Sequence, residues 1–271
     1  MLNYHRRPPL ISFAEAVQSA HSSDGWVELE PFQACQWESQ LLVDYFAKYQ
    51  AKGVKVSLDG SELSSILLGS QGEYGNPQSL LVGCSLKHTN LSRVNLVEVD
   101  CTGAHFKRAN LTEANVSYAI FENGDLSEII AIGIKGFKTI FKGAQLYRGN
   151  LSRSSLNEAD FTGAKLASAD LSGSKLWAAN FTGAYLIGTD LSGSQLNDVQ
   201  LISANLKDAD LSGTDMKRTN LTGANVRGAN FTGVMYLKIG ALTVEQAESA
   251  DTLPNESYLN ATKEYWAQQN R

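Results

Sequence analysis

The chain has 271 residues, of which 43% are hydrophobic and 19% charged, so it is neither a disordered acidic segment nor an integral membrane protein. Its net charge of −5 argues against general binding of nucleic acid through phosphates, and no apolar run approaches the roughly 18 residues of a transmembrane helix. Three cysteines provide no disulfide framework, which favours a reducing compartment.

The first residues resemble an export signal only in part. Arg6-Arg7 could begin a twin-arginine signal, but Pro8 and Pro9 follow at once and Glu15 interrupts the stretch that should be hydrophobic. We therefore expect the protein to stay in the cytoplasm.

The segment before the central repeat is expected to cap it. Leu, Tyr and Phe at helical spacing predict a helix over 38–51, residues 12–20 are a weaker helical segment, and together they suggest a helical cap over 1–55. Residues 56–80 read as a partial coil followed by a Gly-rich loop that resets its phase. The partial coil is indicated by three leucines spaced by five: Leu58, Leu63 and Leu68.

A five-residue period occupies the centre of the chain, from Leu81 to Tyr236. Every fifth residue belongs to one series of 32 positions, and 25 of these are Leu or Phe. A second series lies two residues earlier and is small throughout except at Ile129 and Ile134, while Asn or Asp recurs between the two series. The unit therefore reads Ala-Asn/Asp-Leu/Phe-X-X, as in the pentad that begins at Ala169.

This period fits neither a helix nor an ordinary strand. Successive fifth residues drift by about 140° around a helix, and they alternate between the two faces of a strand. The chain must instead turn once per pentad. Similar residues also recur every 20 positions, as at Phe121, Phe141, Phe161 and Phe181, which predicts a coil with four sides and one large inward residue on each side. Glycines such as Gly163 and Gly173 follow the inward residue where a turn needs positive φ.

In unbroken tandem this unit resembles the pentapeptide-repeat proteins, whose fold is a right-handed quadrilateral β-helix. The resemblance covers residues 81–236, and its 32 pentads imply about eight coils and a rod roughly 38 Å long. It implies a mainly β solenoid, to which the chain adds small α-helical segments at both ends. Many members of the family occur in cyanobacteria and other bacteria, and some regulate another protein by binding it.

Two consecutive pentads exchange large and small residues. Ile129 precedes Ala131 and Ile134 precedes Gly136, so the total inward volume stays about constant. We expect the register to survive from 126 to 141. The alternative is a bulge in which Ile132 or Phe137 turns inward.

If the register holds, this stretch is apolar on the outside. The outward residues are Ile130, Ile132, Phe137 and Ile140. A patch of this kind is either covered, here by the N-terminal block, or binds a partner. We expect the block to cover it.

The residue after each inward residue differs between sides of the coil. On two of the four sides it is repeatedly Ser or Thr, and on the other two sides its type varies. Variety with aromatics is typical of interfaces, although a single exposed Trp is often only tolerated. The resulting partner-binding candidates are Ile132, Phe137, Tyr147, Trp177 and Ile187.

Residues 237–271 are expected to form a C-terminal helical cap. Thr243 and Gln246 have the spacing of a capping box, and Asn255 is positioned to cap a second helix that reaches about Gln269. Helices that cover an open sheet edge prevent aggregation. Dimerisation through the second, aromatic helix is the alternative, so the protein is expected to be a monomer or such a dimer.

The sequence predicts no enzyme, no catalytic residues, no metal site and no cofactor. The four histidines lack ligand spacing among themselves or with the cysteines, and Cys84 and Cys101 fall in the inward series. The aspartates at Asp170, Asp190 and Asp210 are interpreted as turn-forming residues rather than cation ligands.

These features favour a non-catalytic, regulatory scaffold that presents one variable face of the rod to a protein partner of unknown identity, with no membrane and no direct nucleic-acid binding. The alternative is a DNA mimic that binds a type II topoisomerase (gyrase), as the quinolone-resistance members of the family do. Mimicry needs an acidic rod, yet residues 81–236 contain 14 acidic and 15 basic side chains.

Overall fold

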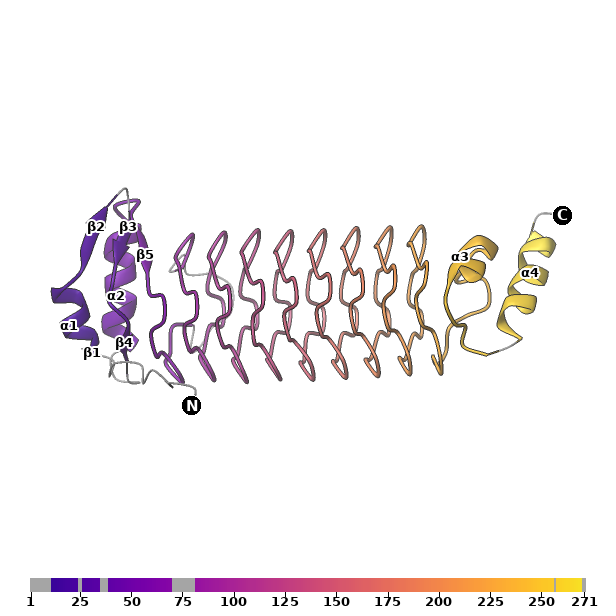
Figure 1. Cartoon of the computed structure of the whole chain (residues 1–271), viewed down its shortest axis with the longest axis horizontal. Helices are drawn as coiled ribbons and strands as arrows, with labels where there is room; N and C mark the ends of the chain where they lie inside the picture. Colours follow the sequence, from indigo (N-terminus) through magenta and orange to yellow (C-terminus); the bar gives the residue numbers. More distant parts are fainter. Residues whose placement is uncertain (1–10, 24–25, 35–38, 70–80, 256, 270–271) are drawn as a thin grey trace, which may run out of the picture.

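The computed structural model of the chain is a rod of stacked coils, with a mixed α/β block at its N-terminal end and two helices at its C-terminal end (Figure 1). The structure describes residues 11–23, 26–34, 39–69, 81–255 and 257–269. None of the described helices has the length and the apolar composition needed to cross a lipid bilayer.

The coils are joined by parallel backbone bridges between residues 20 positions apart. These bridges run without interruption from the pair Ser85–His105 to the pair Asp215–Met235. An inward residue also donates its N–H to a carbonyl in the next coil, as from Leu91 to Asn110 at 2.7 Å. Each rung is one residue long because the chain turns after every pentad. Strands of two or more residues therefore occur, among the described residues, only in the N-terminal block.

Both inward series are buried, as the five-residue period predicts. The large residues from Leu81 to Phe231 and the small residues before them line one continuous core. Phenylalanines from successive coils stack almost parallel: the ring centroids of the pairs Phe121–Phe141, Phe141–Phe161 and Phe161–Phe181 are 5.3, 4.9 and 4.6 Å apart. Burial of each such side chain contributes roughly 1.5–3 kcal/mol, so the core dominates the stability of the rod.

The last position of the large series does not follow the pattern. Tyr236 was expected to point inward, but its side chain is 68% exposed. No complete coil lies beyond it, because the chain leaves the rod after Met235 and enters the C-terminal cap. The inward series therefore ends at Phe231 and Val234.

The corners between sides require a left-handed residue in nearly every pentad. Glycines occupy many of these positions, such as Gly163 and Gly173, each with a φ of 64°. Residues with a side chain adopt the same conformation elsewhere, including Tyr118 at 59° and Ala178 at 55°. Stacking on the coils above and below holds these residues in a conformation that costs about 1–2 kcal/mol for an L-residue.

The two exchanged pentads keep the register of the rod, so the predicted register is confirmed and the bulge is excluded. Ile129 and Ile134 are buried, and the bridges continue through Ile130–Asn150 and Lys135–Ser155. Compensation also comes from the next coil: a Cβ atom placed on Gly149 would lie 3.1 Å from Cγ2 of Ile129. The small residue above thus makes room for the large one below.

The N-terminal block contains β1 (Ile11–Ser12), α1 (Phe13–Gln18), β2 (His21–Ser23), β3 (Trp26–Glu28), β4 (Phe32–Gln33), α2 (Ser39–Gln50) and β5 (Lys55–Ser57). Strands β1 and β4 pair in parallel, and β2, β3 and β5 form a second sheet in that order. Helix α2 lies where the sequence predicts a helix, and α1 falls within the weaker helical segment. The β-strands of this block were not predicted.

The partial coil connects this block to the rod. Bridges join Ser57 to Ser85, Glu62 to Asn90 and Leu67 to Asn95. Leu58, Leu63 and Leu68 are buried beneath the first full coil, with an offset of 28 residues in place of 20. This offset confirms the predicted partial coil in a different frame, while most of the predicted phase-resetting loop lies outside the described residues.

The described N-terminal elements cover the end of the rod, not its side (Figure 1). Strand β5 continues the ladder below the first coil, and β3 pairs with β5. Ile130 is 44% exposed on the side of the rod. The expectation that the N-terminal block covers residues 129–141 is therefore wrong for the part of the block that the structure describes.

The C-terminal cap consists of α3 (Val244–Ser249) and α4 (Tyr258–Gln269). Thr243 and Gln246 form the predicted capping box. The Gln246 side chain also donates to the carbonyls of Leu221 (3.2 Å) and Ala224 (2.8 Å), so this helix end satisfies acceptors of the last coil. The backbone of Thr252 forms a final bridge with Asn230.

Helix α4 is tied to the loop that precedes α3. The Tyr258 hydroxyl donates to the carbonyl of Lys238 at 3.0 Å, and Trp266 Nε1 donates to the carbonyl of Leu242 at 2.9 Å. Asn255 does not cap this helix as predicted; its side chain accepts from Ser257, one residue before α4 begins. Dimerisation through α4 stays a prediction.

Candidate functional site

The four sides of the coil are named here by their inward residues in one coil. Side A contains Phe161, side B Leu166, side C Leu171 and side D Leu176, together with the residues that lie 20 positions before and after each of them. The two corner residues that follow an inward residue are assigned to its side. Sides A and C are opposite one another, and so are sides B and D.

The five predicted partner-binding residues do not form one surface. Phe137 and Trp177 are corner residues of side D, while Tyr147 and Ile187 are corner residues of side B, on the opposite side of the rod. Ile132 lies at a corner of side C. The predicted single variable face is therefore divided among three sides, because residues that differ by ten positions lie half a coil apart.

Side B carries the densest group of exposed aromatic and aliphatic side chains. Tyr147 and Ile187 are both 37% exposed and lie two coils apart in one column. Tyr185 is 51% exposed in the neighbouring column, where its backbone bridges Lys165 below and Asn205 above. Tyr185 was missed from the sequence because only the residues after each inward position were compared. Its column is mostly polar, and a tyrosine in it is the signal that could have identified it.

Side D holds a second group, in which the aromatic residues contact neighbouring side chains. The rings of Tyr118 and Phe137 meet edge to face at 5.5 Å, and Lys138 Nζ lies 5.3 Å from the Phe137 centroid. Trp177 Nε1 donates to Asp198 at 3.0 Å, and Asp198 also forms an ion pair with Arg218. Trp177 remains 47% exposed and is held in place by this carboxylate.

This network perturbs the ionisation of Asp198. The hydrogen bond from Arg218 is the main cause that lowers the pKa of the Asp198 carboxyl, and the hydrogen bond from Trp177 lowers that pKa further. The carboxylate therefore stays ionised to a lower pH than an ordinary aspartate. The hydrogen bond that orients Trp177 is therefore present at every pH at which the Asp198 carboxyl is ionised.

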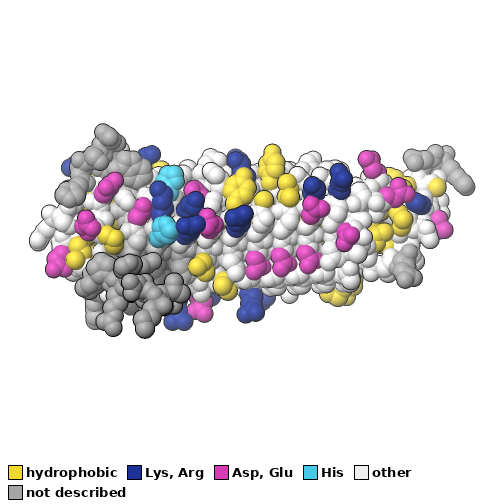
Figure 2. Space-filling view, viewed as in Figure 1, with side chains coloured by type: hydrophobic (Ala, Val, Ile, Leu, Met, Phe, Trp, Pro, Cys, Tyr) yellow, Lys and Arg dark blue, Asp and Glu magenta, His cyan; other side chains and the backbone are white. Residues whose placement is uncertain are grey.

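The side of the rod that contains Ile132 is different again. Ile130 is exposed and Ile132 half-buried, and both interrupt a side that is otherwise polar. Asp170, Asp190 and Asp210 follow in the column of Ile130. Figure 2 shows acidic side chains in a row along the rod, with hydrophobic and basic side chains above that row.

Charge is distributed unevenly around the coil. Side B carries seven Lys or Arg and three Asp or Glu, and side D carries five Lys or Arg and four Asp or Glu. Side C carries two basic and four acidic residues, and side A carries one basic and three acidic residues. The nearly neutral repeat therefore has one clearly basic side, side B, one almost neutral side, side D, and two acidic sides.

The repeated hydroxyl groups are engaged in turns. Ser172 donates through its N–H and its Oγ to Asp170 Oδ1, at 2.9 and 2.6 Å, and Thr162 makes the same pair of bonds with Asp160. This pattern confirms that the aspartate ladder forms turns. No group of three His, Cys, Asp or Glu positioned to hold a metal occurs among the described residues.

The described cysteines belong to the core. Cys84 and Cys101 are buried thiols, and burial raises the pKa of Cys101 well above its usual value. A thiol in this environment is a poor nucleophile because the thiolate is disfavoured. Cys35 lies outside the described residues.

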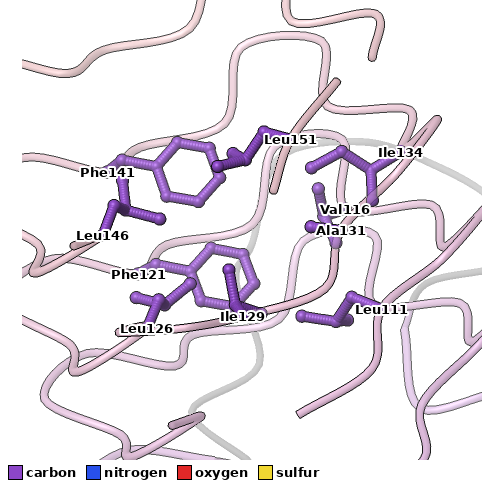
Figure 3. A pocket seen from close by; sticks show the side chains of 10 residues that line it. All are labelled: Leu111, Val116, Phe121, Leu126, Ile129, Ala131, Ile134, Phe141, Leu146 and Leu151. Carbon is purple, nitrogen blue, oxygen red and sulfur yellow. The ribbon is translucent and has the colours of Figure 1, made fainter. Parts of the chain in front are cut away.

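A small apolar cavity lies inside the rod at the exchanged pentads (Figure 3). Its volume is about 10 Å³, and Ala131, Ile129 and Ile134 contribute to its lining beside the stacked rings of Phe121 and Phe141. The cavity is a packing defect left by the exchange, too small for a ligand. Larger open grooves of about 500 and 590 Å³ lie between the last coils and the C-terminal cap.

Comparison with known proteins matches the repeat. The sequence model of a family described as pentapeptide repeats matches eight copies, at residues 89–127, 139–177, 165–201, 179–218 and 194–233. A search of curated protein sequences finds no match.

Solved structures of repeat proteins are similar to the chain at low identity. QnrB1, a plasmid-mediated fluoroquinolone resistance protein, is 20% identical over 66% of this chain and 90% of its own, with a TM-score of 0.37. HetL, a pentapeptide repeat protein involved in heterocyst differentiation regulation in the cyanobacterium Nostoc sp. strain PCC 7120, is 26% identical over 71% of this chain and 96% of its own, with a TM-score of 0.22. A pentapeptide repeat protein from the thylakoid lumen of Arabidopsis thaliana is 26% identical over 57% of this chain and 88% of its own, with a TM-score of 0.20.

Proposed function

The chain belongs to the pentapeptide-repeat family, and from this premise we propose that it is a non-catalytic, regulatory scaffold that binds a protein partner through the outer surface of its coil. The observation that carries the proposal is the exposure of large side chains on a surface that is otherwise polar. Tyr147, Trp177 and Tyr185 are between 37% and 51% exposed. Aromatic residues in such positions are typical of binding surfaces.

The backbone supports this function because it is rigid. Every coil is bonded to the coils above and below it, so the outer side chains are presented at fixed spacing. A surface that is already ordered loses less conformational entropy on binding. We further propose that residues 81–236 have the right-handed hand that is typical of the family and, from their 32 pentads, about eight coils.

Two surfaces of the rod are candidates for binding the partner. The predicted pair Phe137 and Trp177 lies on side D, and the predicted pair Tyr147 and Ile187 lies on side B. Trp177 is supported by Asp198, which favours a defined orientation for contact. Tyr147 and Ile187 have no comparable anchor among the described residues, but they lie beside Tyr185 and several cations.

The DNA-mimic alternative is less well supported by the charge distribution. A surface that imitates a DNA duplex must be acidic along the rod. Side B has an excess of four basic charges, and side D an excess of one. We therefore retain the protein scaffold as the proposed function.

Affinity capture tests the scaffold. The tagged full-length chain is incubated with lysate of the organism that encodes it, alongside a Phe137→Ser/Trp177→Ser variant, a Tyr147→Ser/Ile187→Ser variant and an Ile202→Ser control on side A. We expect the wild type and the control to retain the same protein and one double variant to lose it. Retention of no protein by the wild type would remove the basis of the proposal.

A further inference from the structure

Resting on the proposed scaffold function, we propose that side B is the partner-binding side and that it recognises a protein segment in which Asp or Glu residues flank an exposed apolar side chain. The structure brings apolar and basic residues together there. Tyr185 and Lys165 are bridged neighbours in the middle of side B, and Tyr147 and Ile187 lie in the adjacent corner column.

The apolar part of this surface is continuous across three coils. Ala167 lies between Tyr147 and Ile187 in the corner column: Arg148 donates its N–H to the carbonyl of Ala167, and Ser168 donates its N–H to the carbonyl of Ile187. Tyr185 extends the patch toward the middle of the side. The side chains of Tyr147 and Tyr185 are both exposed, so their rings and hydroxyl groups can contact a ligand.

The basic residues of side B are only partly neutralised: Lys107, Arg108 and Lys207 form ion pairs, whereas Lys87, Arg148, Lys165 and Arg227 form none with the described residues. Elsewhere a cation pairs with a carboxylate one coil away, as in Arg93–Glu113 and Lys138–Glu158. On side B, Glu128 already pairs with both Lys107 and Arg108.

The cations nearest the apolar patch therefore face solvent. Lys165 and Arg148 form no ion pair with any residue that the structure describes, while Lys207, one coil above Ile187, pairs with Asp208. Exposed cations of this kind create a positive potential that attracts acidic partners and fixes their register. Their position beside Tyr147, Tyr185 and Ile187 selects a ligand that combines negative charge with an apolar group.

The neighbouring side favours a protein segment over nucleic acid. Asp170, Asp190 and Asp210 form a column on side C, directly after the corner that bears Tyr147 and Ile187. A broad polyanion such as duplex DNA that lies on side B also approaches this acidic column, which repels it. A narrow peptide can follow side B without crossing the corner.

Peptide selection on the full-length chain tests this assignment. A phage-displayed library of random dodecapeptides is selected against the wild type, and binding of the enriched peptides is measured by fluorescence anisotropy. We expect enrichment of Asp and Glu next to Phe, Leu or Trp, and affinity that falls with added salt. Lys165→Glu and Tyr185→Ser should each weaken binding by about tenfold.

A matched control lies in the same coil on the opposite side. Lys175 is also exposed and occupies the middle of side D, as Lys165 does on side B, so Lys175→Glu should leave affinity within about twofold. Peptides without an excess of acidic residues, or peptides that lose affinity with Lys175→Glu instead, overturn the assignment to side B but leave the scaffold function intact. Failure to enrich any peptide overturns the assignment, and the lysate capture decides separately whether the scaffold function stands.

Two further probes cover the other classes of ligand. A fluorescent DNA duplex and phosphatidylserine vesicles are titrated with the wild type and with Lys165→Glu. We expect neither probe to bind more tightly to the wild type than the selected peptides do. Preferential binding of either probe, abolished by Lys165→Glu, would assign side B to nucleic acid or to a membrane surface and overturn the proposal.

Discussion

Two substitutions together would return the second exchanged pentad to the common pattern. We expect the double variant to lose less free energy of unfolding than the two single variants lose in sum. The two substitutions are Ile134→Ala, which empties the small position, and Gly136→Leu, which fills the large one. Met216 and Thr219 occupy the columns of Gly136 and Thr139 four coils later, so the common arrangement fits this part of the rod.

Each single change has a cost that follows from its surroundings. Ile134 is 2% exposed and adjoins the cavity of about 10 Å³, so its truncation enlarges an existing void. We expect a loss of about 3–5 kcal/mol in the free energy of unfolding, the upper part of the range for such truncations. A Cβ on Gly136 would lie 2.7 Å from Leu156 Cδ2 and 2.8 Å from Thr139 Oγ1. Overpacking of this kind costs about 1–3 kcal/mol.

The double variant tests whether the two positions share one volume. We expect it to be destabilised by only about 1–2 kcal/mol, which corresponds to a favourable coupling of at least about 2 kcal/mol. Urea unfolding is followed by circular dichroism and by tryptophan fluorescence, and coincident transitions establish that one free energy describes each variant. If the two losses simply add, the exchange does not conserve inward volume and the reasoning is refuted.

Three further predictions concern the corners, the cap and the side D network. Ala178→Gly should stabilise the rod by about 0.5 kcal/mol in urea unfolding, whereas Gly183→Ala should destabilise it by about 1 kcal/mol, because both residues have positive φ. Gln246→Ala should lower stability by about 1–3 kcal/mol and increase light scattering, since two carbonyls of the last coils lose their donor. The pKa of the Asp198 carboxyl is lowered, so its hydrogen bond with Trp177 is fully formed above the ordinary aspartate pKa and is lost as the pH falls through the lowered pKa of Asp198. Trp177 fluorescence should therefore change only below about pH 4.

Each of these predictions has a control and an opposing result. A Gly183→Ala variant as stable as the wild type would show that the corner tolerates a side chain without strain. Glu245→Gln changes an exposed residue beside Gln246, and an equal effect from it would assign the loss to the helix in general. Asp198→Asn should remove the fluorescence transition below about pH 4, and persistence of that transition would contradict the role of Asp198.

The sequence predicted the parts of the fold that depend on repetition. A large residue every five positions requires a turn per pentad, and recurrence every 20 positions requires four sides. The exchange at Ile129 and Ile134 was interpreted correctly because inward volume is a local quantity. The room that Gly149 provides for Ile129 was missed, since it depends on which residues stack in adjacent coils.

The ends were predicted less well because they do not repeat. Helices could be placed from spacing and a capping box, whereas the short strands of the N-terminal block pair with one another through residues that lie far apart in the sequence. Tyr236 continues the five-residue period in the sequence but has no coil above it to enclose its ring. Periodicity alone does not show where a solenoid ends.

The candidate surface was identified residue by residue but not as a surface. Tyr147 and Ile187 were selected with Phe137 and Trp177, although the 20-residue period already places the two pairs on opposite sides. Tyr185 was missed because only the residues after each inward position were compared. Sorting residues by their position within the coil, not within the pentad, brings Tyr147, Tyr185 and Ile187 together with Lys165.

Hydroxyl-radical footprinting of the wild-type chain, alone and with the protein that it captures from lysate, tests the central claim most directly. Tyr147, Tyr185 and Trp177 are all exposed enough to be oxidised in the free chain. We predict that the partner protects Tyr147 and Tyr185 and leaves Trp177 as reactive as before. Protection of Trp177 with unchanged oxidation of both tyrosines would contradict the account and move the binding surface to side D.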